Sequence, residues 1–218
     1  MRANDLVTLA IGLPLLAMAT WLALRGSLRG RLLLAGTLGF FLYTYLSMAM
    51  LTAYNALFLV YVAAFVLSLY AFVITMLSFD LADLPRHFSA RLPRRALAAL
   101  LFAIGGFLVL AWLGRIGSPL LRGTTPALEN TTTLVIQALD LSLIAPLAIL
   151  AGVLLLRRSA LGYLLASVAV LKGLTMALAV SAMGINMALA GVPDSPAIVA
   201  PFLVLTLLNL LAAVALLR

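Results

Sequence analysis

The chain consists of long apolar runs, separated by short segments that contain arginine, proline or glycine. A helix that crosses a bilayer needs about 20 mostly apolar residues, and its backbone polar groups must be hydrogen-bonded within the protein. No segment alternates between apolar and polar residues over the roughly ten positions of a barrel strand. We therefore predict an all-α bundle of seven transmembrane helices, at residues 6–24, 32–53, 56–79, 96–114, 133–156, 160–183 and 197–217.

Composition narrows the possible classes of function. Of the 218 residues, 66% are hydrophobic and 9% are charged, whereas a soluble domain carries about 25% charged residues. These values exclude a soluble enzyme, a nucleic-acid-binding protein and a disordered chain. We expect a single integral membrane domain, 1–218, with the lipid bilayer as its surroundings. The chain has no cysteine and a single histidine, His87, so we expect no metal site.

The arginines are divided unequally between the two sides of the predicted bundle. Ten lie on the side of the C-terminus, and three lie on the other: Arg2, Arg115 and Arg122. Because basic residues accumulate in cytoplasmic loops, we predict an outer N-terminus and an inner C-terminus. A cleaved signal peptide ending near Ala19 fits the first run less well, since its arginines follow the apolar core. Thirteen arginines against one lysine favour a bacterial protein of the inner (plasma) membrane.

The chain also resembles itself at an offset of 132 residues. Residues 14–34 and 146–166 are identical at ten of 21 positions, including a proline, an arginine, a serine and a glycine. This alignment predicts a parallel repeat in a 3+1+3 order, with residues 1–79 and 133–217 as three-helix bundles and 96–114 as a linker helix. Such repeats are related by an axis along the membrane normal. The alternative is chance similarity between two apolar segments.

The 3+1+3 order with an outer N-terminus resembles the SWEET and PQ-loop transporter superfamily. That resemblance implies two bundles around a central solute pocket. The motifs of the superfamily are missing, because Pro14-Leu15 and Pro146-Leu147 stand where PQ-loop proteins have Pro-Gln. The second and sixth spans also lack the proline of SWEETs, so hinged rocking is not implied. The helices are similar as well to those of bacterial membrane proteins with no assigned function.

Two charged residues lie well inside predicted spans, Asp140 in the fifth and Lys172 in the sixth. Each charge alone costs about 2.5–3.5 kcal/mol at the centre of a membrane helix, so mutual pairing is favourable. We predict an ion pair between Asp140 and Lys172 on adjacent helices. Two interpretations stay open: a ligand or proton site, or a structural clamp between the two helices.

A polar stripe follows the third span. Its members recur every seven residues and share one helix face: Tyr54, Tyr61, Ser68 and Thr75. Such a face should turn from lipid towards the bundle, where Gln137 and Asn209 could join it around a polar cavity. Interhelical hydrogen bonds explain the same stripe without a ligand. As ligand-binding residues we predict Asp140, Lys172, Gln137, Tyr61 and Ser68.

No nucleophile, metal-ligand set, phosphate-binding loop or acid–base pair of known spacing occurs, so we predict neither an enzyme nor a cofactor. The parallel repeat and the buried charges favour a small-solute or proton-coupled carrier. The competing interpretation is a receptor for a small ligand, or an accessory subunit that packs against another membrane protein. A subunit should present small or polar residues outward, whereas a carrier keeps them inside.

Overall fold

The computed structural model describes residues 2–128, 131–191 and 195–218. Seven helices in this part are long and apolar enough to span a membrane, and no strand occurs in it. The prediction of a seven-helix bundle is thereby confirmed, and the protein has the helices of a multi-pass integral membrane protein. The spans are Asp5–Leu24, Leu28–Leu51, Phe58–Leu77, Arg94–Leu121, Val135–Leu156, Ala160–Leu189 and Val199–Leu217.

Three of the spans are the single helices α3 (Leu28–Leu51), α4 (Phe58–Leu77) and α5 (Arg94–Leu121). Two are single helices near the end, α8 (Ala160–Leu189) and α9 (Ser195–Leu217). The helix α5 continues seven residues beyond the predicted end at residue 114. The helix continues through Arg115, because a long basic side chain can extend its charged head towards the membrane surface.

The first and fifth spans are each divided by a π-helical turn. The first span contains α1 (Arg2–Val7), the turn Thr8–Gly12 and α2 (Leu13–Leu24). The fifth contains α6 (Val135–Leu139), the turn Asp140–Ile144 and α7 (Ala145–Leu156). In both, a proline is the second residue after the turn. Proline lacks an N–H and crowds the carbonyl four residues earlier, which favours a wider turn at that point.

The two divided spans end in the same kind of connection. Residues with positive φ follow at Gly26 (78°) and Arg158 (58°), and an extended serine then begins the next helix in each case, Ser27 and Ser159. The backbone hydrogen bonds correspond as well, since the serine N–H donates to Leu22 in one connection and to Leu154 in the other. Every one of these features recurs at an interval of 132 residues.

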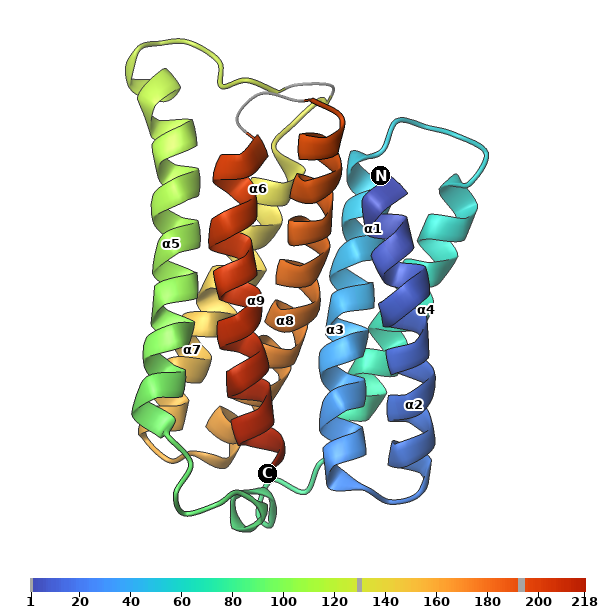
Figure 1. Ribbon diagram of the computed structural model, residues 1–218, viewed down its shortest axis with the longest axis vertical. Coiled ribbons are helices and arrows are strands. Elements are labelled where there is room, and N and C mark those ends of the chain that lie inside the picture. The colour runs from blue at the N-terminus through green and yellow to red at the C-terminus, as the bar shows by residue number, and fades with distance from the viewer. Residues whose placement is uncertain (1, 129–130, 192–194) are drawn as a thin grey trace.

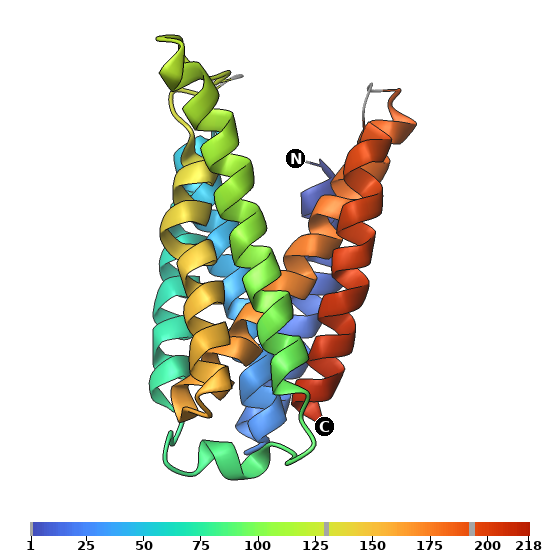
Figure 2. The ribbon, with the colours of Figure 1, turned by 90° about the vertical axis from the view of Figure 1, so that its left-hand side faces the viewer.

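The two ends of the chain lie at opposite ends of the bundle, as an odd number of spans requires (Figure 1). The connections α2–α3, α4–α5 and α7–α8, which hold Arg25, Arg86, Arg91, Arg157 and Arg158, lie at the end that carries the C-terminus (Figure 1). We call the opposite end the outer end, following the predicted orientation. Towards it, α8 and α9 lean away from α5 and α6 (Figure 2).

The centre of the bundle is the packing of α3 against α8. The helix α3 also contacts α2 and α4, whereas α8 also contacts α7 and α9, and α5 packs mainly on α7. Glycine allows the close central approach, because a Cβ placed on Gly36 would overlap Cβ of Leu171. The two sides of the bundle therefore meet where one of them has no side chain.

We expect Gly36→Ala to lower the free energy of unfolding by about 1–3 kcal/mol, the usual cost of overpacking a core. Gly106→Ala on α5 is the matched control, because nothing lies within 4 Å of a Cβ at that position. The control should be neutral or up to about 1 kcal/mol more stable, since alanine favours the helix. Thermal unfolding in detergent measures both variants, and equal midpoints would contradict the close approach of α3 and α8.

Candidate functional site

Asp140 is the first residue of the second π-helical turn and lies inside the bundle, with 8% of its surface exposed. Its two carboxylate oxygens accept hydrogen bonds from two different helices. The Tyr43 hydroxyl of α3 donates to Oδ1 at 2.7 Å, and the Trp112 Nε1–H of α5 donates to Oδ2 at 2.9 Å. Neutral donors therefore satisfy both oxygens of a buried carboxylate, which would otherwise be costly in an apolar bundle.

Lys172 of α8 is buried to a similar degree, with 7% of its surface exposed. Its Nζ lies 4.0 Å from the centroid of the Tyr43 ring, in cation–π geometry. The lysine stem passes Gly39 of α3, where an added Cβ would lie 3.7 Å from Cβ and Cγ of Lys172. Tyr43 therefore contacts both charged residues, the carboxylate with its hydroxyl and the ammonium with its ring.

The predicted direct ion pair is wrong. Among the described residues, the ion pairs within 4.0 Å join Asp83 to Arg86 and to His87, and none joins Asp140 to Lys172. Each carboxylate oxygen instead accepts a hydrogen bond from a neutral donor, Tyr43 or Trp112. Charge attraction acts here across an aromatic side chain that the sequence pattern did not single out. We call Tyr43, Trp112, Asp140 and Lys172 the Asp140 cluster.

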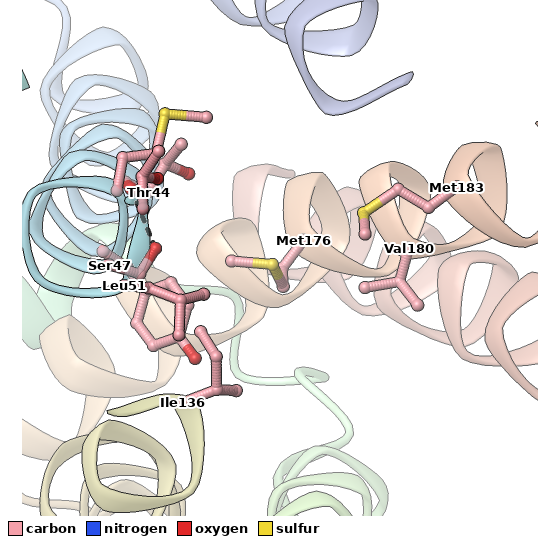
Figure 3. A pocket seen from close by; sticks show the side chains of 10 residues that line it. Thr44, Ser47, Leu51, Ile136, Met176, Val180 and Met183 are labelled. Carbon is pink, nitrogen blue, oxygen red and sulfur yellow. Dashed lines mark hydrogen bonds between the residues drawn. The ribbon is translucent and has the colours of Figure 1, made fainter. Parts of the chain in front are cut away.

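An outer cavity of about 320 Å³ begins at this cluster, between α3, α6 and α8. Figure 3 shows Thr44, Ser47 and Leu51 of α3 on one side, Met176, Val180 and Met183 of α8 on the other, and Ile136 of α6 between them. Tyr43 forms part of the same wall. The wall is mostly apolar, with hydroxyl groups on the α3 side.

An inner cavity of about 100 Å³ lies on the other side of the cluster. Its polar lining residues are Asp140, Lys172 and Asn209, and its remaining walls are apolar side chains of α5, α7, α8 and α9 together with Gly173. Met176 lines both cavities. Charged groups from the fifth and sixth spans thus border a cavity between α5, α7, α8 and α9.

Asn209 of α9 is fully buried. Its Nδ2 donates to the Leu205 carbonyl of the same helix at 2.8 Å, while its Oδ1 has no partner among the described residues. A Cβ on Gly173 of α8 would lie 2.8 Å from Oδ1, so this glycine makes room for the amide. Of the residues proposed for a polar cavity, Asn209 is the one that lies with Asp140 and Lys172.

The remaining residues of the predicted site do not join the cluster. Ser68 and Thr75 are buried, but each hydroxyl donates to a carbonyl of its own helix, Phe65 and Ala71. Gln137 is buried on α6 one turn before Asp140, and Tyr61 is half-buried on α4. None of Ser68, Gln137 and Tyr61 is among the residues that line the two cavities.

The polar stripe itself is shorter than predicted. Tyr54 precedes α4 and is 86% exposed, so it does not share the face of that helix. The helix α4 packs on α3, and its serine and threonine satisfy themselves locally, as hydroxyls in membrane helices commonly do. These side chains therefore need neither a ligand nor a neighbouring helix.

Sequence reasoning missed Tyr43 and Trp112. Nothing in the spacing of Tyr43 separates it from the other aromatic residues of the second span. Trp112 lies near the outer end of the predicted fourth span, where tryptophan is common at membrane interfaces for reasons unrelated to a site. One signal was available, because a buried aspartate needs hydrogen-bond donors from neighbouring helices.

Comparison with protein-family models, with curated proteins and with solved structures finds no match for this chain.

Proposed function

We propose that this protein is a carrier that binds a small solute in the two cavities, next to the Asp140 cluster. The observation that carries the proposal is the placing of a carboxylate and an ammonium group on the wall of the inner cavity in a membrane bundle, with Tyr43 of the same cluster on the wall of the outer cavity. Ionisable residues in membrane spans are rare because they are costly, and they commonly mark solute or proton pathways. A packing role alone would not call for a cavity beside the charged groups.

The proposal includes the 3+1+3 parallel repeat and the outer N-terminus in an inner membrane. The recurrence of the π-helical turns and of the following connections at an interval of 132 residues supports the repeat. Contacts between the halves are reciprocal too, because α1 packs on α8 and α6 packs on α3. The outer cavity lies between α3 and α8, one helix from each proposed repeat, which is where parallel-repeat carriers hold their solutes.

The proposed repeats differ at the site itself. Thr8 and Phe40 stand at the positions that correspond to Asp140 and Lys172. Phe40 and Phe41 pack edge-to-face in a small apolar cluster that also contains Val7 and Ala179. The charged arrangement thus belongs to one half, which favours a dedicated site over a packing device common to both.

A second candidate is a receptor or accessory subunit that packs against another membrane protein. One observation favours it: three glycines of α5 have nothing within 4 Å of an added Cβ, Gly106, Gly114 and Gly117. Small residues of this kind permit close helix contact. A partner helix on α5 would leave the two cavities free for a ligand, so transport is the property that separates the candidates.

A thermal-unfolding screen in detergent tests the proposal, with neutral, cationic and anionic small solutes as separate sets. A solute at about 100 times its Kd should stabilise the folded protein by about 2.7 kcal/mol. The shift should disappear in Asp140→Asn and Lys172→Met and persist in Ser142→Ala. Ser142 is the matched control because it is exposed on the same π-helical turn and donates to the Ala138 carbonyl.

Uptake of each stabilising solute into proteoliposomes then separates a carrier from a receptor. Uptake that Asp140→Asn abolishes supports the carrier, whereas binding without uptake supports the receptor. A screen without any stabilising solute, or with shifts that both variants retain, would overturn the proposed site.

A further inference from the structure

The Asp140 cluster leaves one charged group with unused hydrogen-bonding capacity. A lysine ammonium has three N–H donors, and no described residue accepts a hydrogen bond from Nζ of Lys172. The oxygens of Asp140, by contrast, are both engaged with Tyr43 and Trp112. Both oxygens of Asp140 accept hydrogen bonds from the protein, whereas the ammonium of Lys172 donates none to a described residue and lies against the face of the Tyr43 ring.

The unused donors belong to a residue that is more than nine-tenths buried and that lines the inner cavity. A cation–π contact engages one side of the ammonium. The other donors need acceptors, because an ammonium in an apolar interior is costly without them. The inner cavity is the space from which such an acceptor can reach Nζ.

We propose that the inner cavity binds a short-chain monocarboxylate, whose carboxylate accepts hydrogen bonds from Nζ of Lys172. This inference rests on the proposed function and names the class of solute for the same site. Both the charge and the size of the ligand follow from the walls of the cavity.

The walls favour a single negative charge on a short apolar body. Asp140 lines the same cavity, so a second negative charge on the ligand would lie near a carboxylate and be repelled. Away from the polar residues the lining is aliphatic and aromatic, including Ile144, Ala177 and Phe202, which suits a hydrocarbon tail. The volume of about 100 Å³ is well below the roughly 300–1,000 Å³ of pockets for drug-sized ligands, which favours a short acid.

Acetate and propionate are the probes, and acetamide and propionamide are neutral molecules of the same shape. Sodium gluconate, a carboxylate too large for the inner cavity, keeps the ionic strength constant, and sodium chloride tests a halide. Thermal unfolding and calorimetric titration are recorded for the detergent-purified protein. We expect saturable stabilisation by acetate or propionate and none by the amides.

Substitutions at the inner cavity test whether the carboxylate binds there. Lys172→Met and Lys172→Gln should weaken the apparent affinity about tenfold or more, as expected for loss of a charged hydrogen-bond donor. Ala177→Leu should also weaken it, because Ala177 lines the inner cavity and a larger side chain fills it while Lys172 remains. Ser142→Ala should bind as the wild type does. If one lysine variant does not fold, the other and Ala177→Leu still decide the question.

The inference is overturned if propionamide stabilises as well as propionate, if chloride alone stabilises, or if the carboxylate shift persists in the lysine variants and in Ala177→Leu. Failure here is distinguishable from failure of the proposed function. When neutral or cationic solutes bind and are lost in Asp140→Asn while carboxylates have no effect, the solute class is wrong and the site stands. When no class of solute binds, both are wrong.

Discussion

Replacing Asp140 by alanine should lower the free energy of unfolding by about 3–5 kcal/mol, the usual cost of removing one partner from a buried charged arrangement. The substitution leaves the Tyr43 hydroxyl and the Trp112 N–H without their acceptors, and it leaves Lys172 without a nearby negative charge. Each of these groups is then unsatisfied in an apolar interior. Equilibrium unfolding in mixed micelles of mild detergent and dodecyl sulfate measures the loss.

Three further variants show which interactions of Asp140 account for the loss of stability. Asp140→Asn keeps the volume and one carbonyl acceptor, so its cost should be about 1–3 kcal/mol, and Ser142→Ala should cost almost nothing. Lys172→Met is the informative contrast, because Asp140 keeps both of its neutral donors when the lysine is gone. It should be neutral or stabilising, whereas a direct ion pair would make loss of either charge costly. A Lys172→Met variant as unstable as Asp140→Ala would contradict the arrangement described for the cluster.

The sequence was sufficient for the large features of the fold because those features follow from hydrophobicity alone. Seven apolar runs predicted seven spans, and all seven occur. The ends of the spans were less certain, since α5 passes Arg115 and α8 extends to Leu189. A charged residue near a membrane surface costs little, so it is a poor marker of where a helix stops.

The charged residues of the site were predictable from the sequence, whereas their hydrogen-bond partners were not, and this difference has a physical cause. The high cost of charge in a bilayer identifies Asp140 and Lys172 from their positions in apolar runs, and the structure places both at the inner cavity. Their hydrogen-bond partners depend on how helices pack, which no single run records. Tyr43 and Trp112 come from α3 and α5, far from Asp140 in the sequence. The polar stripe on α4 does not supply these partners, because Ser68 donates its hydrogen bond to a carbonyl of its own helix.

The second π-helical turn links a proline, Pro146, to the contacts that Asp140 makes with α3 and α5. Pro146 lacks the N–H that a regular helix would use, and the Ala145 N–H donates five residues back to the Asp140 carbonyl. The wider turn begins at Asp140, whose side chain lies between α3 and α5. The proline is visible in the sequence, but its effect on Asp140 becomes evident only with the backbone hydrogen bonds.

Tyr43 contacts both charged residues and both halves of the proposed repeat, so its truncation should be costly. Tyr43→Ala removes a buried ring, the hydrogen bond to Asp140 and the cation–π contact with Lys172. Replacing a large buried aromatic side chain by alanine costs about 3–5 kcal/mol, and we expect a loss in that range in the same mixed-micelle unfolding experiment.

Tyr43→Phe separates the contributions of the ring and the hydroxyl. Phenylalanine keeps the ring beside Lys172 and the wall of the outer cavity, and it removes only the donor to Asp140, so we expect a loss of about 1–3 kcal/mol. A solute that reaches the inner cavity should still bind this variant, because Lys172 keeps its aromatic neighbour. If Tyr43→Phe were as unstable as Tyr43→Ala, the ring would contribute nothing, and the ammonium would have to be stabilised by Asp140 alone. If Tyr43→Phe were as stable as the wild type, the hydroxyl would not hold the carboxylate, and the direct pairing of the two charges expected from the sequence would regain its support.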